Sequence, residues 1–114
     1  MTEPLLLQEF VQKSTLNGIK LFITAAPINA GLASAVASMT PVPVINFPLA
    51  SAHLQNTEAL FAFAQTPEGI PVSTMGFGLA GGRNAAILAA QILSVADVHL
   101  RERVRFFKQN NCRF

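Results

Sequence analysis

The chain has 114 residues, of which 51% are hydrophobic and only 12% are charged, and its formal net charge is +2. This length allows one domain with a single core, so we treat residues 1–114 as one domain. The only cysteine, Cys112, excludes an internal disulfide and a cysteine-based metal site. Apolar runs are interrupted before the roughly 20 residues that span a bilayer. The first ten residues also lack the features of a signal peptide, and we therefore expect a cytoplasmic protein.

Helix-forming and strand-forming patterns alternate along the first half of the chain. Hydrophobic spacing predicts a helix over residues 5–16 that ends at Asn17 and Gly18. The apolar run over residues 19–25 predicts a buried strand. A helix of small residues is expected over residues 30–39, with Asn29 as its cap.

The alternation continues through the second half. Residues 42–47 predict a second strand, and a third helix is expected to begin at Thr57. Residues 72–77 predict a third strand, which a glycine-rich turn over residues 78–82 joins to an apolar helix. Continuously apolar strands alternating with helices predict an α/β fold: a parallel sheet of about three strands in three layers, with helices on both faces.

The last predicted helices differ sharply in character. From residue 85 to residue 93 only Gln91 is polar, and a helix without a polar face must be buried all round. We therefore expect a homo-oligomer in which other copies cover the helix Asn84–Leu93. The following segment, residues 100–114, is basic but interrupted by Glu102 and has no aromatic platform. It is predicted to continue or bend from the apolar helix as a solvated helix, and nucleic acid is not an expected partner.

A GxGxxG motif occupies residues 76–81, between the third strand and the apolar helix. Such glycines can let the backbone approach a dinucleotide pyrophosphate. The motif lies in the last strand–helix unit instead of the first, and no later strand ends in an acidic residue for the ribose. The favoured interpretation is that the glycines let the helix pack closely, and no cofactor is expected.

Titratable residues do not form a recognisable catalytic or metal site. The two histidines, His53 and His99, lack a second histidine or carboxylate at metal-ligand spacing, so no metal is expected. Ser51 lies near His53, but no local feature activates it as a nucleophile. Both histidines are interpreted as surface residues.

From about residue 24 to residue 93 the chain resembles the PurE family, whose members act in purine biosynthesis as 5-carboxyaminoimidazole ribonucleotide mutase or 5-aminoimidazole ribonucleotide carboxylase. Weaker similarity extends over both ends. The matching segments are Met39-Thr40, Pro43-Val44-Ile45, Pro48, Ser51, Leu54, Leu60, Gln65, Pro67, Gly69-Ile70-Pro71-Val72, Gly78, Ala80-Gly81 and Asn84-Ala85-Ala86-Ile87-Leu88-Ala89-Ala90-Gln91-Ile92-Leu93.

The resemblance implies a flavodoxin-like sheet and a homo-octamer in which the last apolar helix packs among neighbours. It also exposes departures from the family pattern. Gly31 stands where the family has a catalytic histidine, and the family's N-terminal phosphate loop and Ser-Ala-His-Arg motif have no counterpart. No catalytic residue can be transferred, so we expect an oligomeric PurE-like domain without this activity on its own, in a structural, regulatory or binding role.

Two alternatives stay open. The chain could be one half of a split enzyme, because the strand over residues 19–25 would be an exposed edge that another copy or a partner chain fills. Alternatively, a rebuilt cleft at the strand ends could bind a small nucleotide-like ligand. The candidate residues for this cleft are Asn29, Gly31, Asn46, His53 and Arg83. Simpler roles are favoured for three of them: Asn29 as a helix cap, Asn46 as a turn residue and Arg83 as a first-turn surface charge.

Overall fold

The computed structural model describes residues 4–27, 31–49 and 66–113 of the chain. The third helix predicted from Thr57, and the candidate residues Asn29 and His53, lie outside these ranges. The described elements are α1 (Pro4–Leu16), β1 (Phe22–Ala26), α2 (Leu32–Met39), β2 (Val44–Pro48), β3 (Ser73–Thr74), α4 (Gly78–Ser94) and α5 (Val98–Gln109).

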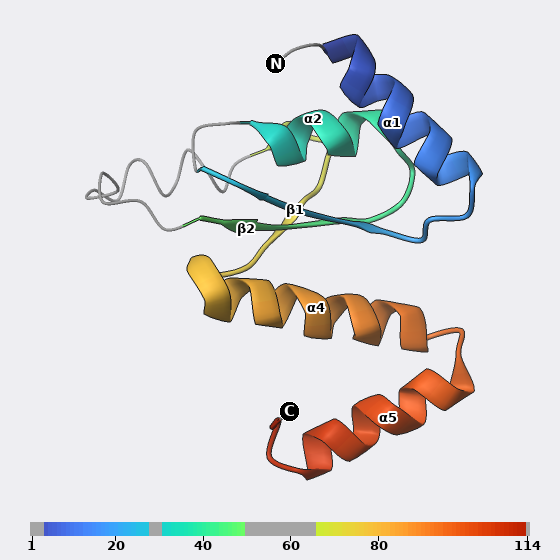
Figure 1. Cartoon of the computed structure of the whole chain (residues 1–114), viewed down its shortest axis with the longest axis vertical. Helices are drawn as coiled ribbons and strands as arrows, with labels where there is room; N and C mark the ends of the chain where they lie inside the picture. Colours follow the sequence, from blue (N-terminus) through green and yellow to red (C-terminus); the bar gives the residue numbers. More distant parts are fainter. Residues whose placement is uncertain (1–3, 28–30, 50–65, 114) are drawn as a thin grey trace.

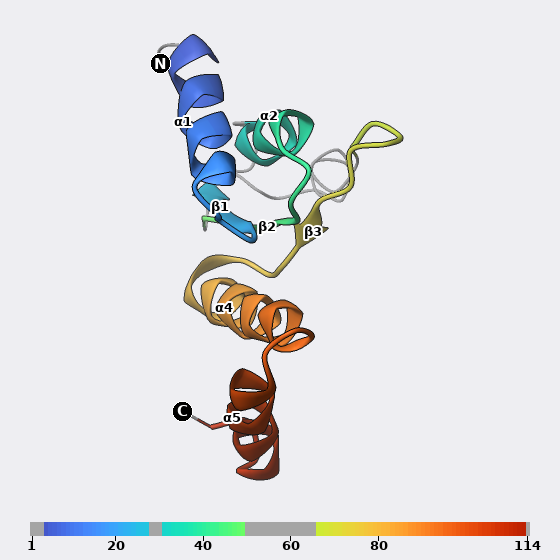
Figure 2. The same cartoon turned by 90° about the vertical axis from the view of Figure 1, so that its right-hand side faces the viewer.

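The three described strands form one parallel sheet in the order β1-β2-β3. Helices α1 and α2 lie on one face of this sheet and α4 lies on the other, which confirms the three-layer α/β prediction (Figure 1). The last helix, α5, lies beyond α4 on the side away from the sheet, as Figure 2 also shows. Among the described residues, no helix combines the length and the hydropathy of a membrane span.

The core is divided into two clusters by β2. Val44 packs with Val11 and Val36 between the sheet and helices α1 and α2. The next residue, Ile45, packs with Ala85 and Ala89 of α4 on the opposite face. Successive side chains of a strand point to opposite faces, so a strand covered on both sides must be apolar at successive positions. This requirement explains the uninterrupted apolar runs from which the parallel sheet was predicted.

Several predicted boundaries are wrong by a few residues. The last helix of the core begins at Gly78, inside the segment expected to be a turn, and β3 is much shorter than predicted. Strand β2 continues to Pro48, one residue beyond the prediction. The N-cap of α2 is Gly31, and Asn29, the predicted cap, lies outside the described residues.

A tight corner separates α4 from α5, so the apolar helix does not continue into the basic segment. Asp97 is the N-cap of α5 and its Oδ1 accepts a hydrogen bond from the Leu100 N–H at 3.0 Å. The Arg101 guanidinium donates to the carbonyl oxygens of Ser94, at 3.2 Å, and Val95, at 2.7 Å. These carbonyls close the last turn of α4, where a cation is favourable. The direction of α5 is therefore fixed by side chains at both ends of the corner.

Candidate functional site

The carboxyl ends of the parallel strands meet at one edge of the sheet, which is the usual ligand position in open α/β folds. β1 ends at Ala26, β2 ends at Pro48, and β3 is followed by a short loop into α4. The sequence predicts that the candidate residues of the rebuilt cleft lie at this edge. Three of them, Gly31, Asn46 and Arg83, lie within the described residues.

Asn46 lies inside β2 and is buried, so its interpretation as a turn residue is wrong. Its Oδ1 accepts a hydrogen bond at 2.7 Å from the Thr24 hydroxyl, and Thr24 is its direct neighbour in β1. The Asn46 backbone carbonyl accepts from the Met75 N–H at 2.7 Å. A buried polar side chain is tolerated in a strand when it has such a partner. The carboxamide oxygen is therefore already engaged within the sheet.

Gly31 stands at the N-cap of α2 in the left-handed conformation, with φ 68° and ψ 12°. It provides no side-chain cap, and a Cβ built on it would meet no atom within 4 Å. The position thus has room for a side chain but a backbone that disfavours one. No titratable group is present where the resemblance places the catalytic histidine.

Space around the glycine-rich start of α4 is filled by the chain itself. A Cβ on Gly81 would lie 1.6 Å from the carbonyl oxygen of Gly76, and one on Gly82 would lie 3.2 Å from the Phe47 ring. A carbonyl oxygen is a hydrogen-bond acceptor and repels a phosphate oxygen, which is also an acceptor. These contacts support the interpretation that the glycines serve close packing instead of binding a nucleotide.

The remaining polar candidates are not brought together. Arg83 is exposed in the second turn of α4, not the first, and His99 is exposed on α5 beyond the core. Within the described ranges, no group of three or more His, Cys, Asp or Glu side chains is arranged to hold a metal ion. Among the described residues, the carboxyl-end edge of the sheet therefore holds the hydrogen-bonded pair Thr24 and Asn46 and the glycine Gly31, whereas Arg83 lies apart on the surface of α4.

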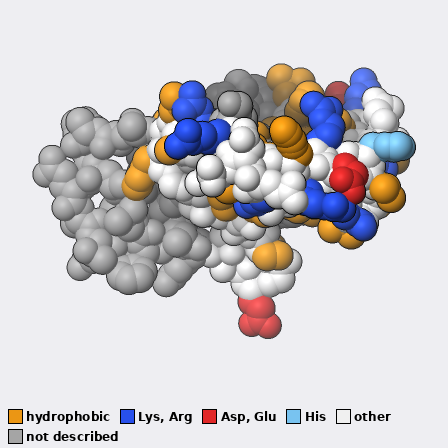
Figure 3. Space-filling view, turned by 90° about the horizontal axis from the view of Figure 1, so that it is seen from below, with side chains coloured by type: hydrophobic (Ala, Val, Ile, Leu, Met, Phe, Trp, Pro, Cys, Tyr) orange, Lys and Arg blue, Asp and Glu red, His pale blue; other side chains and the backbone are white. Residues whose placement is uncertain are grey.

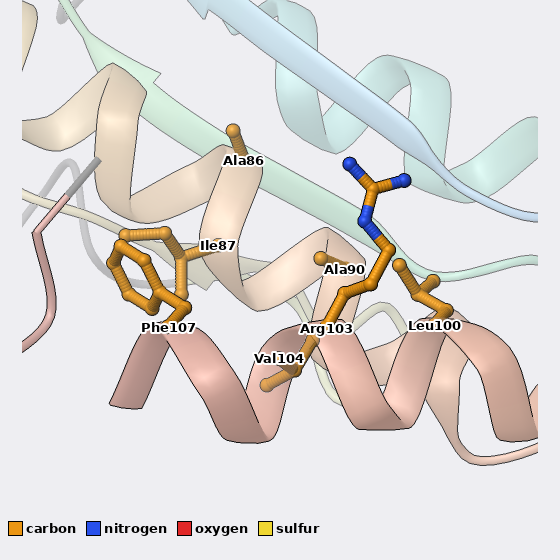
Figure 4. A pocket seen from close by; sticks show the side chains of 7 residues that line it. All are labelled: Ala86, Ile87, Ala90, Leu100, Arg103, Val104 and Phe107. Atoms are coloured by element: carbon orange, nitrogen blue, oxygen red, sulfur yellow. The ribbon is translucent and has the colours of Figure 1, made fainter. Parts of the chain in front are cut away.

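A hollow that sequence analysis missed lies between α4 and α5. It has a volume of about 320 Å³, and side chains of both helices converge on it (Figure 4). The signal was the apolar spacing of Leu100, Val104 and Phe107, which form one stripe within the basic segment. The lining residues are Ala86, Ile87, Ala90, Leu100, Arg103, Val104 and Phe107.

The surface around α5 mixes charge with apolar side chains. Seen from the α5 side, basic side chains are scattered among apolar ones (Figure 3). Val98 and Phe106 are exposed there, and α5 buries none of its described residues. The predicted solvated, charged helix is therefore incomplete as a description of α5, because this helix also carries an apolar stripe. The described face around α5 is an exposed surface with both apolar and basic side chains.

Comparison with known proteins identifies close relatives. A family model described as AIR carboxylase matches residues 2–113. The chain is 40% identical over 102 residues to the N5-carboxyaminoimidazole ribonucleotide mutase of Haemophilus influenzae, which covers 90% of this chain and 62% of that protein. The proteins of the same name from Escherichia coli K12 and Vibrio vulnificus are 39% and 36% identical, covering 88% and 92% of this chain and 59% and 65% of their own lengths. The chain thus spans less than two thirds of the length of these relatives.

Proposed function

The chain belongs to the AIR carboxylase family, and from this premise we propose that it is a PurE-like oligomeric domain without mutase or carboxylase activity of its own. Its role is then structural, regulatory or that of a binding module. The observation that carries the proposal is Gly31, which occupies the position of the family's catalytic histidine. What the resemblance implies for that histidine is the transfer of a proton as carboxylate moves on or off the imidazole ring.

Glycine cannot replace such a group, and the described neighbours at the strand ends do not compensate. Loss of a general acid or base typically lowers a rate by about 10²–10⁴. The nearest described polar pair, Thr24 and Asn46, consists of a hydroxyl and a carboxamide that bond to each other. Neither group titrates near neutral pH, so neither can take over proton transfer.

Association of copies through α4 is supported by what a single chain leaves uncovered. The chain buries only Gly81, Ala85, Ala89 and Ser94 of this helix. Leu93 keeps 38% of its surface exposed, although it ends a segment, residues 85–93, in which only Gln91 is polar. The apolar hollow against α5 adds to this surface. Contiguous apolar surface of this kind marks an interaction site, and a second copy in the segment Asn84–Leu93 is the proposed occupant.

A direct assay tests the loss of activity. The purified chain is incubated with N5-carboxyaminoimidazole ribonucleotide, and the substrate is followed beside a buffer blank and a full-length relative. We expect decay at the blank rate, and saturable turnover would reject the proposal. Gly31→His and Gly31→Ala share the same backbone strain, so activity gained only by Gly31→His would assign the loss to this position.

A two-chain enzyme is the alternative, and the observation in its favour is the outer edge of β1, beside which no strand lies among the described residues. A separate polypeptide would then lie along the Ile19–Ala25 segment and supply the missing chemistry. Purification of the chain from its native host tests this directly. A stoichiometric partner together with mutase activity would favour the alternative, whereas the chain recovered without a partner would reject it.

A further inference from the structure

The outer edge of β1 has no described strand beside it, because β1 is the end strand of the sheet. Its inner edge is defined by hydrogen bonds: the Phe22 N–H donates to the Pro43 carbonyl at 2.9 Å, and the Leu49 N–H donates to the Ala26 carbonyl at 3.1 Å. Backbone groups alternate in direction along a strand. The N–H and C=O groups of Leu21, Ile23 and Ala25 therefore point outward.

This edge lacks the features with which proteins usually protect an edge strand. Strand β1, with the sequence FITAA, has no charged residue and no proline, and its register with β2 is continuous. Ile23 keeps 43% of its surface exposed, and Ala25 is exposed beside it. The opposite edge, β3, is only two residues long, which is itself a protection. The outward side of β1 is therefore the less protected of the two edges of the described sheet.

We propose that β1 pairs with β1 of a second copy, antiparallel, about a twofold axis at Ile23, so that one sheet continues through two subunits. Ile23 then faces Ile23 of the partner subunit, and Leu21 faces Ala25 of the partner subunit. Every outward N–H and C=O of these residues finds a partner in this register. An antiparallel strand at the edge of a parallel sheet is a common arrangement.

Pro27 selects this register over its neighbour. It is the next outward position after Ala25 but has no N–H to donate. An axis at Thr24 would place Leu21 opposite Pro27 of the partner subunit and leave the Leu21 carbonyl without a donor. The axis at Ile23 keeps Pro27 outside the paired segment.

A second copy suits this edge better than a foreign strand because the edge is complementary to itself. The nearest charged residue, Lys20, would lie opposite Ala26 of the partner subunit, so like charges do not face each other. The two exposed Ile23 side chains would cover one another on the same face, as cross-strand apolar pairs do. Because a twofold contact uses the same surface on both subunits, it closes after two copies. The proposed contact is separate from the α4 surface and does not depend on the absence of catalysis.

Cysteine cross-linking tests the contact and its register. Directly opposed residues of a hydrogen-bonded antiparallel pair have Cα atoms about 5.5 Å apart, which is within the range that a disulfide bridges. The variants are Ile23→Cys and, as a control, Leu49→Cys, both in a Cys112→Ser background. Leu49 has a nearly identical exposure of 44% but does not lie on the outer edge. Mild oxidation at the high protein concentration that favours the contact should give a covalent dimer of the Ile23→Cys variant at least tenfold faster than of the control. Equal rates, or no dimer, would overturn the proposal.

Amide hydrogen exchange of the unmodified chain provides a second test that needs no variant. The Phe22 and Thr24 amides point toward β2 and should be protected at all protein concentrations. The Ile23 and Ala25 amides should be protected at high concentration and exchange freely on dilution. Protection of the Ile23 and Ala25 amides that persists at every dilution would show that the same chain covers this edge. Protection that appears only when a foreign polypeptide is bound would show that a different molecule occupies it. Either result would overturn self-pairing.

Discussion

The two faces of the sheet are covered by different arrangements of helices (Figure 1). On one face, α1 and α2 close over Val11, Val36 and Val44, which are almost entirely buried within the chain. On the other face, α4 is buried only along its sheet-facing stripe, and α5 touches α4 without burying any of its own described residues. On both faces the chain leaves large apolar side chains exposed: Leu6 and Leu16 of α1 on the first face, and Leu93 of α4 on the second. Apolar residues outside the two core clusters therefore stay on the surface of the single chain.

The largest effect is expected where the two faces meet, in β2. Ile45 is 1% exposed and packs against Ala85 and Ala89. Ile45→Ala should lower the free energy of unfolding by about 2–5 kcal/mol, because it removes apolar contacts and leaves a cavity. Phe106→Ala, at a position 60% exposed on α5, should change it little and instead weaken association. Equal losses of unfolding free energy for the two variants in urea denaturation would mean that Phe106 of α5 contributes to stability as much as Ile45 of β2, which contradicts the prediction.

The close packing of α4 on its preceding turn is tested by a pair of glycines. Gly81→Ala would place a methyl group 1.6 Å from the Gly76 carbonyl oxygen, which belongs to the backbone and cannot move alone. We expect a loss of at least about 1–3 kcal/mol, the usual range for overpacking. Gly82→Ala meets only the Phe47 ring at 3.2 Å and should cost clearly less. Thermal unfolding of both variants measures the contrast, and a Gly81→Ala variant as stable as Gly82→Ala would refute it.

The buried polar pair of the sheet is tested by a double-mutant cycle. Thr24→Val removes the donor of the 2.7 Å hydrogen bond and leaves the Asn46 carboxamide oxygen buried without it. We expect a loss of about 1–3 kcal/mol. Asn46→Leu should cost less when it is combined with Thr24→Val than when it is made alone, because the buried Thr24 hydroxyl is then no longer left without its acceptor. Additive losses in chemical denaturation would mean that the two side chains do not act as a unit.

The smallest effect is expected at the corner that joins the well-covered core to α5. Arg101→Met keeps much of the apolar stem but loses the hydrogen bonds to the Ser94 and Val95 carbonyls. We expect a loss of about 1 kcal/mol, reduced by the exposure of the guanidinium. Faster amide exchange confined to α5 would locate the effect. Arg103→Met, in the next turn of the same helix, is the control, and an equal response would exclude a specific role for Arg101.

The sequence predicted the fold better than it predicted the strand ends. The α/β class, the parallel sheet and the helices now seen as α1, α2 and α4 follow from periodicity, which burial on two faces imposes. Asn46 was predicted in a turn, whereas it lies in β2 and is hydrogen-bonded to Thr24 of β1. The residue type alone does not distinguish these two environments, since the hydrogen-bond partner is 22 residues away in the chain. The hollow between α4 and α5 was not predicted because the segment was interpreted from its basic residues, and the apolar spacing of Leu100, Val104 and Phe107 was not considered. The cleft stays a prediction for Asn29 and His53, which lie outside the described residues.

The central claim is that one chain cannot cover its own apolar surface and therefore associates. Sedimentation velocity over a wide dilution series tests this most directly. The account predicts species well above the 12.2 kDa of a single chain, dissociating only at high dilution. A folded monomer that persists at every concentration, with α4 and α5 as resistant to exchange as α2, would contradict it.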